Sequence, residues 1–95
     1  MKPMVTVTNI FPKVALDKLT SECNLKTNES GVSSTMEELG RMVSESDAII
    51  TYLSDKIDRD IIDQSTKMKL IANYGAGFNN IDVTYASQRG IWVTN

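Results

Sequence analysis

The apolar residues of this 95-residue chain recur with two periods, that of a strand and that of a helix, and stretches with one period alternate with stretches with the other. Valines alternate with threonines near the start, which is typical of a strand, over residues 3–9. After Pro12, apolar residues recur at spacings of three and four, which predicts a helix of about ten residues. The members of its apolar face are Leu16, Leu19 and Cys23. Residues 24–27 give a weaker strand signal, and turn-forming residues follow over 28–34.

The middle of the chain repeats this alternation with clearer boundaries. Thr35 and Glu38 have the spacing of a capping box, which predicts a helix that begins after Thr35. The apolar face of that helix is Met36, Leu39 and Val43. Residues 48–53 then form a near-continuous run of apolar and β-branched residues, which is typical of a central parallel strand buried on both faces.

A third helix and a fourth strand follow. Asp58 is placed to cap this helix, and Ile57 and Ile62 are spaced to form a hydrophobic staple across its first turn. The helix is expected to end near residues 65–66. Residues 70–73 are then the next strand, a short apolar run.

The last part of the chain contains one more helix and one more strand. Asp82 is placed as the helix cap, and Gly90 stands where a left-handed residue commonly ends a helix. Residues 91–94 form the final strand. Strands and helices that alternate with short connections predict an α/β fold, an open parallel sheet of about five strands with helices on both faces.

The composition of the chain mainly excludes some classes of partner and site. The net charge of -2, without a long run of either sign, argues against a nucleic-acid partner. Cys23 is the single cysteine, so no disulfide can form within the chain, and a reducing, cytoplasmic setting is favoured. The apolar runs are too short for a membrane span, and the first residues lack the pattern of a signal peptide. The chain has no histidine, so it offers no imidazole as acid, base or metal ligand.

The candidate chemistry lies in residues 70–82, where a strand runs into a loop with two glycines. Gly75-Ala76-Gly77 lacks the third glycine of a dinucleotide fingerprint, because Asn80 stands at that place. No cofactor-binding residue is therefore predicted in this loop. Two interpretations stay open: a tight turn that needs positive φ, or a cradle of backbone N–H groups that binds a carboxylate.

Polar residues after the other central strand have several interpretations. Leu53 and Ser54 end that strand, so their backbone is expected beside the glycine loop; Ser54 is either a ligand contact or an ordinary loop serine. Asp55, Asp58 and Asp60 lack the alternation and glycine of a calcium loop and are interpreted as helix caps and helix-dipole partners, so no metal site is predicted. Two further residues are interpreted as packing residues: Cys23 and Trp92.

Two stretches of the chain carry a family resemblance. The first is the run LIANYGAGFNNID at residues 70–82, followed by Ala86, by residues 89–91 and by residues 93–95. It closely resembles the D-isomer-specific 2-hydroxyacid dehydrogenases, a family that includes glyoxylate and hydroxypyruvate reductases. The second is similar to the reductase-like branch and consists of the run YLSD at 52–55, followed by Ile57, Asp58, Ile61 and Ile62. The likeness covers the whole chain in element order.

The resemblance implies a whole protein of two domains. One is a flavodoxin-like substrate domain, and the other is a Rossmann domain inserted into it that binds NAD or NADP. Residues 1–95 would be the N-terminal part of the substrate domain, truncated before the cofactor domain. The resemblance also implies that backbone at Ala76 and Gly77 holds the substrate carboxylate. The predicted substrate-binding residues are Leu53, Ser54, Tyr74, Gly75, Ala76 and Gly77.

The resemblance further implies that the catalytic arginine, glutamate and histidine lie beyond this chain. We therefore expect the chain alone to be inactive and to bind no cofactor. The whole protein is expected to reduce a 2-oxo acid such as glyoxylate, hydroxypyruvate or pyruvate to the D-2-hydroxy acid, as a homodimer in the cytoplasm. The missing closing segments are expected to leave one sheet face incompletely covered, and the exposed apolar area would favour self-association.

The alternative is a free-standing flavodoxin-like module that binds a ligand or a protein and has no enzymatic activity. A phosphoacceptor receiver needs acidic residues just after the first strand, where Asn9, Ile10 and Phe11 stand. A flavin carrier needs a phosphate-binding loop at the same place, and Phe11, Pro12 and Lys13 offer little for that purpose.

Overall fold

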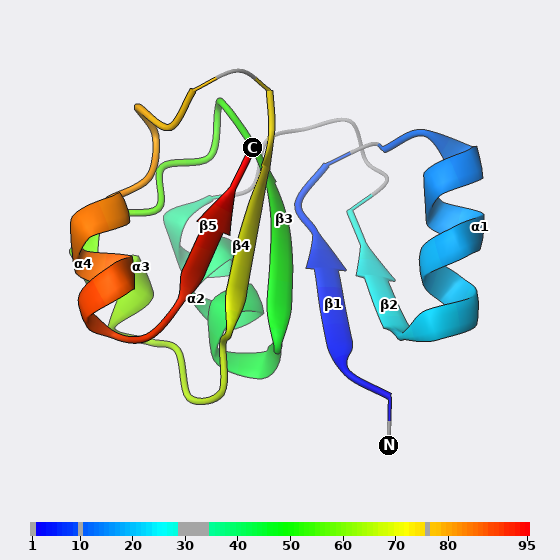
Figure 1. The fold of residues 1–95 in the computed structure, drawn as a ribbon, viewed down its shortest axis with the longest axis horizontal. Coiled ribbons are helices and arrows are strands. Elements are labelled where there is room, and N and C mark those ends of the chain that lie inside the picture. The colour runs from blue at the N-terminus through cyan, green and yellow to red at the C-terminus, as the bar shows by residue number, and fades with distance from the viewer. Residues whose placement is uncertain (1, 10, 29–34, 76) are drawn as a thin grey trace.

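The computed structural model of the chain describes residues 2–9, 11–28, 35–75 and 77–95. In these residues, strands and helices alternate along the chain, and the strands form one parallel sheet in the order β2-β1-β3-β4-β5 (Figure 1). The elements are β1 (Met4–Val7), α1 (Lys13–Glu22), β2 (Asn24–Thr27), α2 (Met36–Glu45), β3 (Ala48–Tyr52), α3 (Arg59–Ile62), β4 (Leu70–Tyr74), α4 (Val83–Gln88) and β5 (Trp92–Thr94). This arrangement confirms the predicted flavodoxin-like α/β fold with an open parallel sheet.

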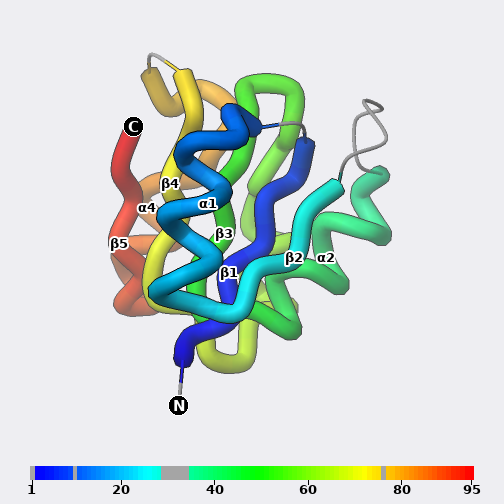
Figure 2. Tube along the Cα trace, turned by 90° about the vertical axis from the view of Figure 1, so that its right-hand side faces the viewer, coloured from blue at the N-terminus to red at the C-terminus, as the bar shows by residue number. Residues whose placement is uncertain are grey.

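The main hydrophobic core lies between the sheet and a layer formed by α2, α3 and α4, while α1 lies on the other side of the sheet (Figures 1 and 2). The strand register places Ile49, Ile71 and Val93 side by side on the face toward the three-helix layer. The helices contribute Leu39, Val43, Ile61, Ile62 and Ala86. Burial of these apolar side chains is the main favourable term that holds the helices on the sheet.

The opposite face of the sheet is covered less completely. The one helix on this face among the described residues is α1, which contacts β2 and has no fully buried residue. Trp92 and Tyr74, farther along the sheet on the same face, are 77% and 49% exposed. The prediction that Trp92 is a packing residue is therefore wrong. The expected self-association through such a face stays a prediction.

The same uneven cover changes the interpretation of β3. Ile49 and Thr51 are fully buried, but the alternate positions of this strand are only half-buried. The prediction of a strand buried on both faces is therefore wrong. The run of β-branched residues reflects one buried face and one half-buried face.

Helix α2 confirms its predicted cap. The Thr35 hydroxyl accepts a hydrogen bond from the Glu38 amide at 3.1 Å, and the Glu38 carboxylate accepts one from the Thr35 amide at 2.8 Å. The hydrogen bonds from Thr35, the backbone one foremost, lower the pKa of Glu38. Met36 is 51% exposed, however, so its predicted place on the apolar face is wrong; Gly40 is buried there with Leu39.

The two short helices α3 and α4 also begin as predicted. The Asp58 and Asp82 carboxylates accept hydrogen bonds from the backbone amides of the third helical residue, each at 3.0 Å. Helix α3 ends at Ile62, earlier than expected, and the chain continues in hydrogen-bonded turns. Gly90 follows α4 with φ +77°, as its position predicts. Cys23 is buried but lies one residue beyond α1, as its C-cap.

Some expectations concern residues outside the described part of the chain, namely Ile10, most of the predicted turn at 28–34 and Ala76. None of the described helices has the length and apolar character that a membrane crossing requires.

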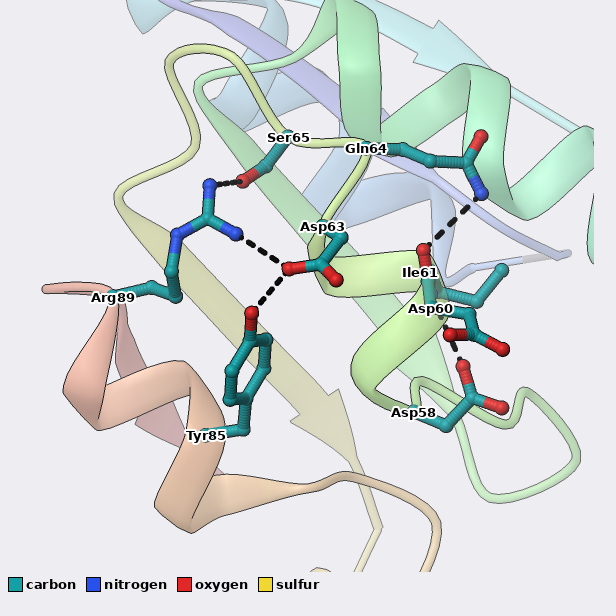
Figure 3. A network of polar contacts seen from close by, with 8 residues as sticks. All are labelled: Asp58, Asp60, Ile61, Asp63, Gln64, Ser65, Tyr85 and Arg89. Atoms are coloured by element: carbon teal, nitrogen blue, oxygen red, sulfur yellow. Dashed lines mark hydrogen bonds and ion pairs between the residues drawn. The ribbon is translucent and has the colours of Figure 1, made fainter.

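A surface network of polar contacts joins α3 to α4 (Figure 3). The Asp63 carboxylate accepts hydrogen bonds from the Tyr85 hydroxyl and, at 2.9 Å, from Nη1 of Arg89. The Arg89 guanidinium also reaches the Ser65 hydroxyl at 3.5 Å, and the Arg59 guanidinium lies 4.4 Å from the centre of the Tyr85 ring. Helices this short are unstable alone. The network therefore adds to the buried contacts that hold them together.

We expect the Asp63→Ala variant to lose about 1 kcal/mol of unfolding free energy, because it removes the shared acceptor of two partners at a half-exposed site. Urea denaturation measures this loss. The control is Asp17→Ala, at an exposed position of α1. Equal losses in the two variants would contradict the role given to the Asp63 carboxylate.

Candidate functional site

The carboxyl ends of β3 and β4 meet at one edge of the sheet and bring two loops together. Tyr52 and Tyr74 pair at the ends of these strands, so the Leu53–Ser54 turn and the glycine loop leave the sheet side by side (Figure 1). A Cβ at position 75 would lie 3.1 Å from Cγ of Leu53. The expectation that this turn lies beside the glycine loop, at the edge where α/β proteins bind ligands, is confirmed for Leu53. The place of Ser54 opposite the loop stays a prediction.

The glycine loop has the backbone conformation that its sequence requires. Gly75 has φ +151° and Gly77 has φ +87°, values that side chains other than glycine rarely allow. A Cβ on Gly77 would meet nothing within 4 Å, so this glycine is needed for its backbone angles and not for lack of space. The tight-turn interpretation is supported, and the open space at Gly77 also leaves room for a ligand.

Two backbone amides of this loop, those of Gly75 and Gly77, are available for binding. Gly75 and Gly77 are exposed, and in the described part of the chain neither amide donates a hydrogen bond. Leu53 and Ser54 are also exposed, and the Leu53 side chain lies next to Gly75. A surface loop with unengaged N–H groups is suited to an anion, because successive backbone amides can point at one oxygen group.

Beneath the loops lies a network of side-chain amides that sequence reasoning missed. The Asn73 amide donates to the backbone oxygen of Gly77 at 3.1 Å and pairs with the Asn80 amide at 3.0 and 3.1 Å. The Thr51 hydroxyl donates to Oδ1 of Asn73 at 2.9 Å. The signal for this network is polar residues at core-facing positions of apolar strands, because buried polar groups need partners.

Asp55 closes the turn that carries Leu53 and Ser54. Its backbone amide donates to the oxygen of Tyr52 at 2.9 Å, while its Oδ2 atom accepts from the Tyr52 amide at 2.9 Å and from the Thr8 hydroxyl. Asp55 is 1% exposed, and its Oδ1 atom is the one buried side-chain polar atom without a hydrogen-bond partner in the described residues. The interpretation of Asp55 as a helix cap or helix-dipole partner is wrong.

Aromatic rings line the side of the glycine loop that faces α1. The Tyr74 ring contacts the rings of Phe11 and Tyr52, with centroid distances of 5.1 and 5.2 Å. The pKa of the Tyr52 hydroxyl is raised, mainly by burial and to a smaller extent by the nearby Tyr74 and the Asp55 carboxylate. At neutral pH this hydroxyl is therefore neutral and leaves an uncharged wall beside the loop.

The residues present do not fit a dinucleotide. Helix α4 begins several residues after the glycines, and its first turn already binds the carboxylate of Asp82. A pyrophosphate needs a free helix N-terminus close to the glycine loop. Within the described residues, no group of three or more His, Cys, Asp or Glu side chains is placed to hold a metal ion.

Comparison with known proteins gives the family. Residues 5–95 match the family model of the D-isomer specific 2-hydroxyacid dehydrogenase, catalytic domain. The chain belongs to this family. A glyoxylate reductase of Pyrococcus horikoshii is 37% identical over 95 residues, which are 100% of this chain and 28% of that protein.

Solved structures show the same fold. A crystal structure of a protein from Pyrococcus horikoshii has a TM-score of 0.90 and 29% identity, and the match covers 100% of this chain and 28% of that one. A 3-phosphoglycerate dehydrogenase of Entamoeba histolytica with bound NAD+ has a TM-score of 0.79 and 25% identity, over 98% of this chain and 32% of that one. The chain thus spans less than a third of these relatives, as it does of the glyoxylate reductase.

We expect Asp55→Ala to lower the free energy of unfolding by about 1–3 kcal/mol, because buried hydrogen-bonding groups of Thr8 and Tyr52 lose their acceptor. Urea denaturation measures the loss, and faster hydrogen exchange at the Tyr52 amide locates it in the turn. Asp17→Ala, at an exposed position of α1, is the control. Unchanged exchange at Tyr52 would show that Asp55 does not hold this turn.

Proposed function

We propose that this chain forms the substrate-carboxylate site of an NAD(P)-dependent D-2-hydroxyacid dehydrogenase. The whole protein would reduce a 2-oxo acid of the glyoxylate, hydroxypyruvate or pyruvate type to the D-2-hydroxy acid. The observation that carries this proposal is the exposed glycine loop, in which the Gly75 and Gly77 amides make no hydrogen bond within the described residues and Ser54 lies on the neighbouring loop. Family membership and the glyoxylate reductase relative support the choice of substrate class.

In this proposal the chain binds and orients one end of the substrate. Backbone N–H groups of Gly75 and Gly77 donate to the carboxylate, since hydrogen bonds to an ionised acceptor are stronger than those between neutral groups. The Ser54 hydroxyl donates from the neighbouring turn. Leu53 and Tyr74 flank the site with apolar surface, and Ala76 would belong to the same loop. The hydride would be supplied by a nicotinamide that residues outside this chain would hold.

The proposal also assigns a place to the chain in the whole protein. Residues 1–95 would be the N-terminal part of the substrate domain, with the NAD- or NADP-binding domain supplied by sequence outside this chain. The protein would work as a homodimer in the cytoplasm. The catalytic histidine that the family resemblance implies would also come from outside residues 1–95, since these contain no histidine.

Carboxylate binding can be tested on the chain itself by NMR. We expect oxamate, a 2-oxo acid analogue that cannot be reduced by hydride, to shift the amide resonances of Gly75, Gly77 and Ser54. In Gly77→Ala the affinity should fall about tenfold, because the new residue resists the φ angle that presents the amide.

The matched control is Gly90→Ala. Gly90 has φ +77°, close to the +87° of Gly77, and a Cβ at either position meets nothing within 4 Å. Both variants therefore carry a similar backbone strain, but Gly90 is remote from the loop, after α4. Equal loss of oxamate affinity in both variants, or shifts confined to other amides, would contradict the carboxylate site.

We expect the 95-residue chain alone to show no oxidation of NADH with glyoxylate, hydroxypyruvate or pyruvate. It has no histidine to deliver the proton, and its glycine loop does not fit the cofactor. NADH absorbance measures the reaction. A rate above that of a sample without protein would contradict this expectation.

A further inference from the structure

One side chain, Asn80, connects the two loops of the candidate site. Its Nδ2 atom lies 2.9 Å from the backbone oxygen of Tyr52 and 2.9 Å from that of Asp55. These two carbonyl groups bracket the turn that carries Leu53 and Ser54. Asn80 thus binds both ends of one loop by its amide.

The same amide reaches the glycine loop through Asn73. The Asn80 and Asn73 side chains donate to each other's oxygen atoms, and Asn73 also donates to the backbone oxygen of Gly77. The backbone oxygen of Asn80 accepts a further hydrogen bond, at 2.8 Å, from the amide of Ile57. A continuous chain of contacts therefore runs from the turn at Ser54 to Gly77.

Only an amide of this size meets these requirements. Nδ2 of asparagine has two hydrogens, which three acceptors share: the carbonyl oxygens of Tyr52 and Asp55, each at 2.9 Å, and Oδ1 of Asn73 at 3.1 Å. The Oδ1 atom of Asn80 accepts from Asn73. An ionised aspartate has no hydrogen to donate and would set its charge against both carbonyl oxygens. The preceding residue, Asn79, is exposed and makes none of these contacts.

We propose that Asn80 is a positioning residue that sets the spacing between the Leu53–Ser54 turn and the glycine loop, so that both loops bind one carboxylate as a unit. The inference rests on the proposed function for the identity of the ligand. Its geometric part, the spacing of the loops, does not depend on any ligand. Two measurements therefore separate it from the proposed function.

The first measurement needs no ligand. In the unmodified chain, NMR should show nuclear Overhauser contacts between the Leu53 side chain and the α-protons of Gly75, which lie together. Asn80→Asp should lose these contacts, whereas Asn79→Asp, with the same change of charge one residue away, should keep them. If Asn80→Asp does not give a folded amide spectrum, the milder Asn80→Ser variant is read in the same way. Retained contacts in the folded Asn80 variant overturn the proposal.

The second measurement is a double-mutant cycle with oxamate. Ser54→Ala should weaken oxamate binding about threefold to tenfold in the unmodified chain, the size of one hydrogen bond. In the Asn80→Ser variant, the additional Ser54→Ala change should leave the oxamate affinity almost unchanged, because the turn no longer faces the glycine loop. If Asn80 only stabilises the fold, Ser54→Ala will weaken oxamate binding equally with and without the Asn80→Ser change, and that result overturns the proposal.

Absence of oxamate binding to the unmodified chain overturns the proposed function. The nuclear Overhauser contacts between Leu53 and Gly75 then still decide the role of Asn80.

Discussion

The site depends on the pairing of two side-chain amides, Asn73 and Asn80, beneath the ends of β3 and β4. Parallel strands end with backbone groups that no further strand residue satisfies, and a polar group left unpaired in the interior costs free energy. The amide pair and Asp55 satisfy carbonyl and amide groups there and thereby fix the direction in which each loop leaves the sheet. Without this constraint the two loops would share an edge of the sheet but no defined spacing.

Hydrophobic burial packs the layers of the fold together, whereas this polar network positions the loops. The buried isoleucines between the sheet and α2, α3 and α4 hold the layers together, but apolar contacts are not directional and leave loop geometry open. The network adds direction at the one edge where the loops meet. The exposed glycine amides therefore stay open to a ligand while the residues beneath them keep the loops in place.

Features that depend on neighbours in sequence could be predicted from the sequence. The caps at Thr35, Asp58 and Asp82, and the left-handed Gly90 just after α4, need only residues within one turn, so their patterns were sufficient. The exposure of Trp92 was not predictable in this way, because it depends on which helices cover that face of the sheet. The role of Asp55 depends on Thr8, 47 residues away, and a local pattern of acidic residues could not show it.

The two interpretations of the glycine loop, tight turn and carboxylate cradle, are compatible in physical terms. A positive φ turns the backbone away from the ladder of β4, and the amides of Gly75 and Gly77 are thereby left without partners in the described part of the chain. An exposed amide without a partner costs little in water and gains a charge-assisted hydrogen bond when a carboxylate arrives. The turn geometry that required glycine is thus also the geometry that makes an anion site, provided that the buried amides hold Ser54 opposite.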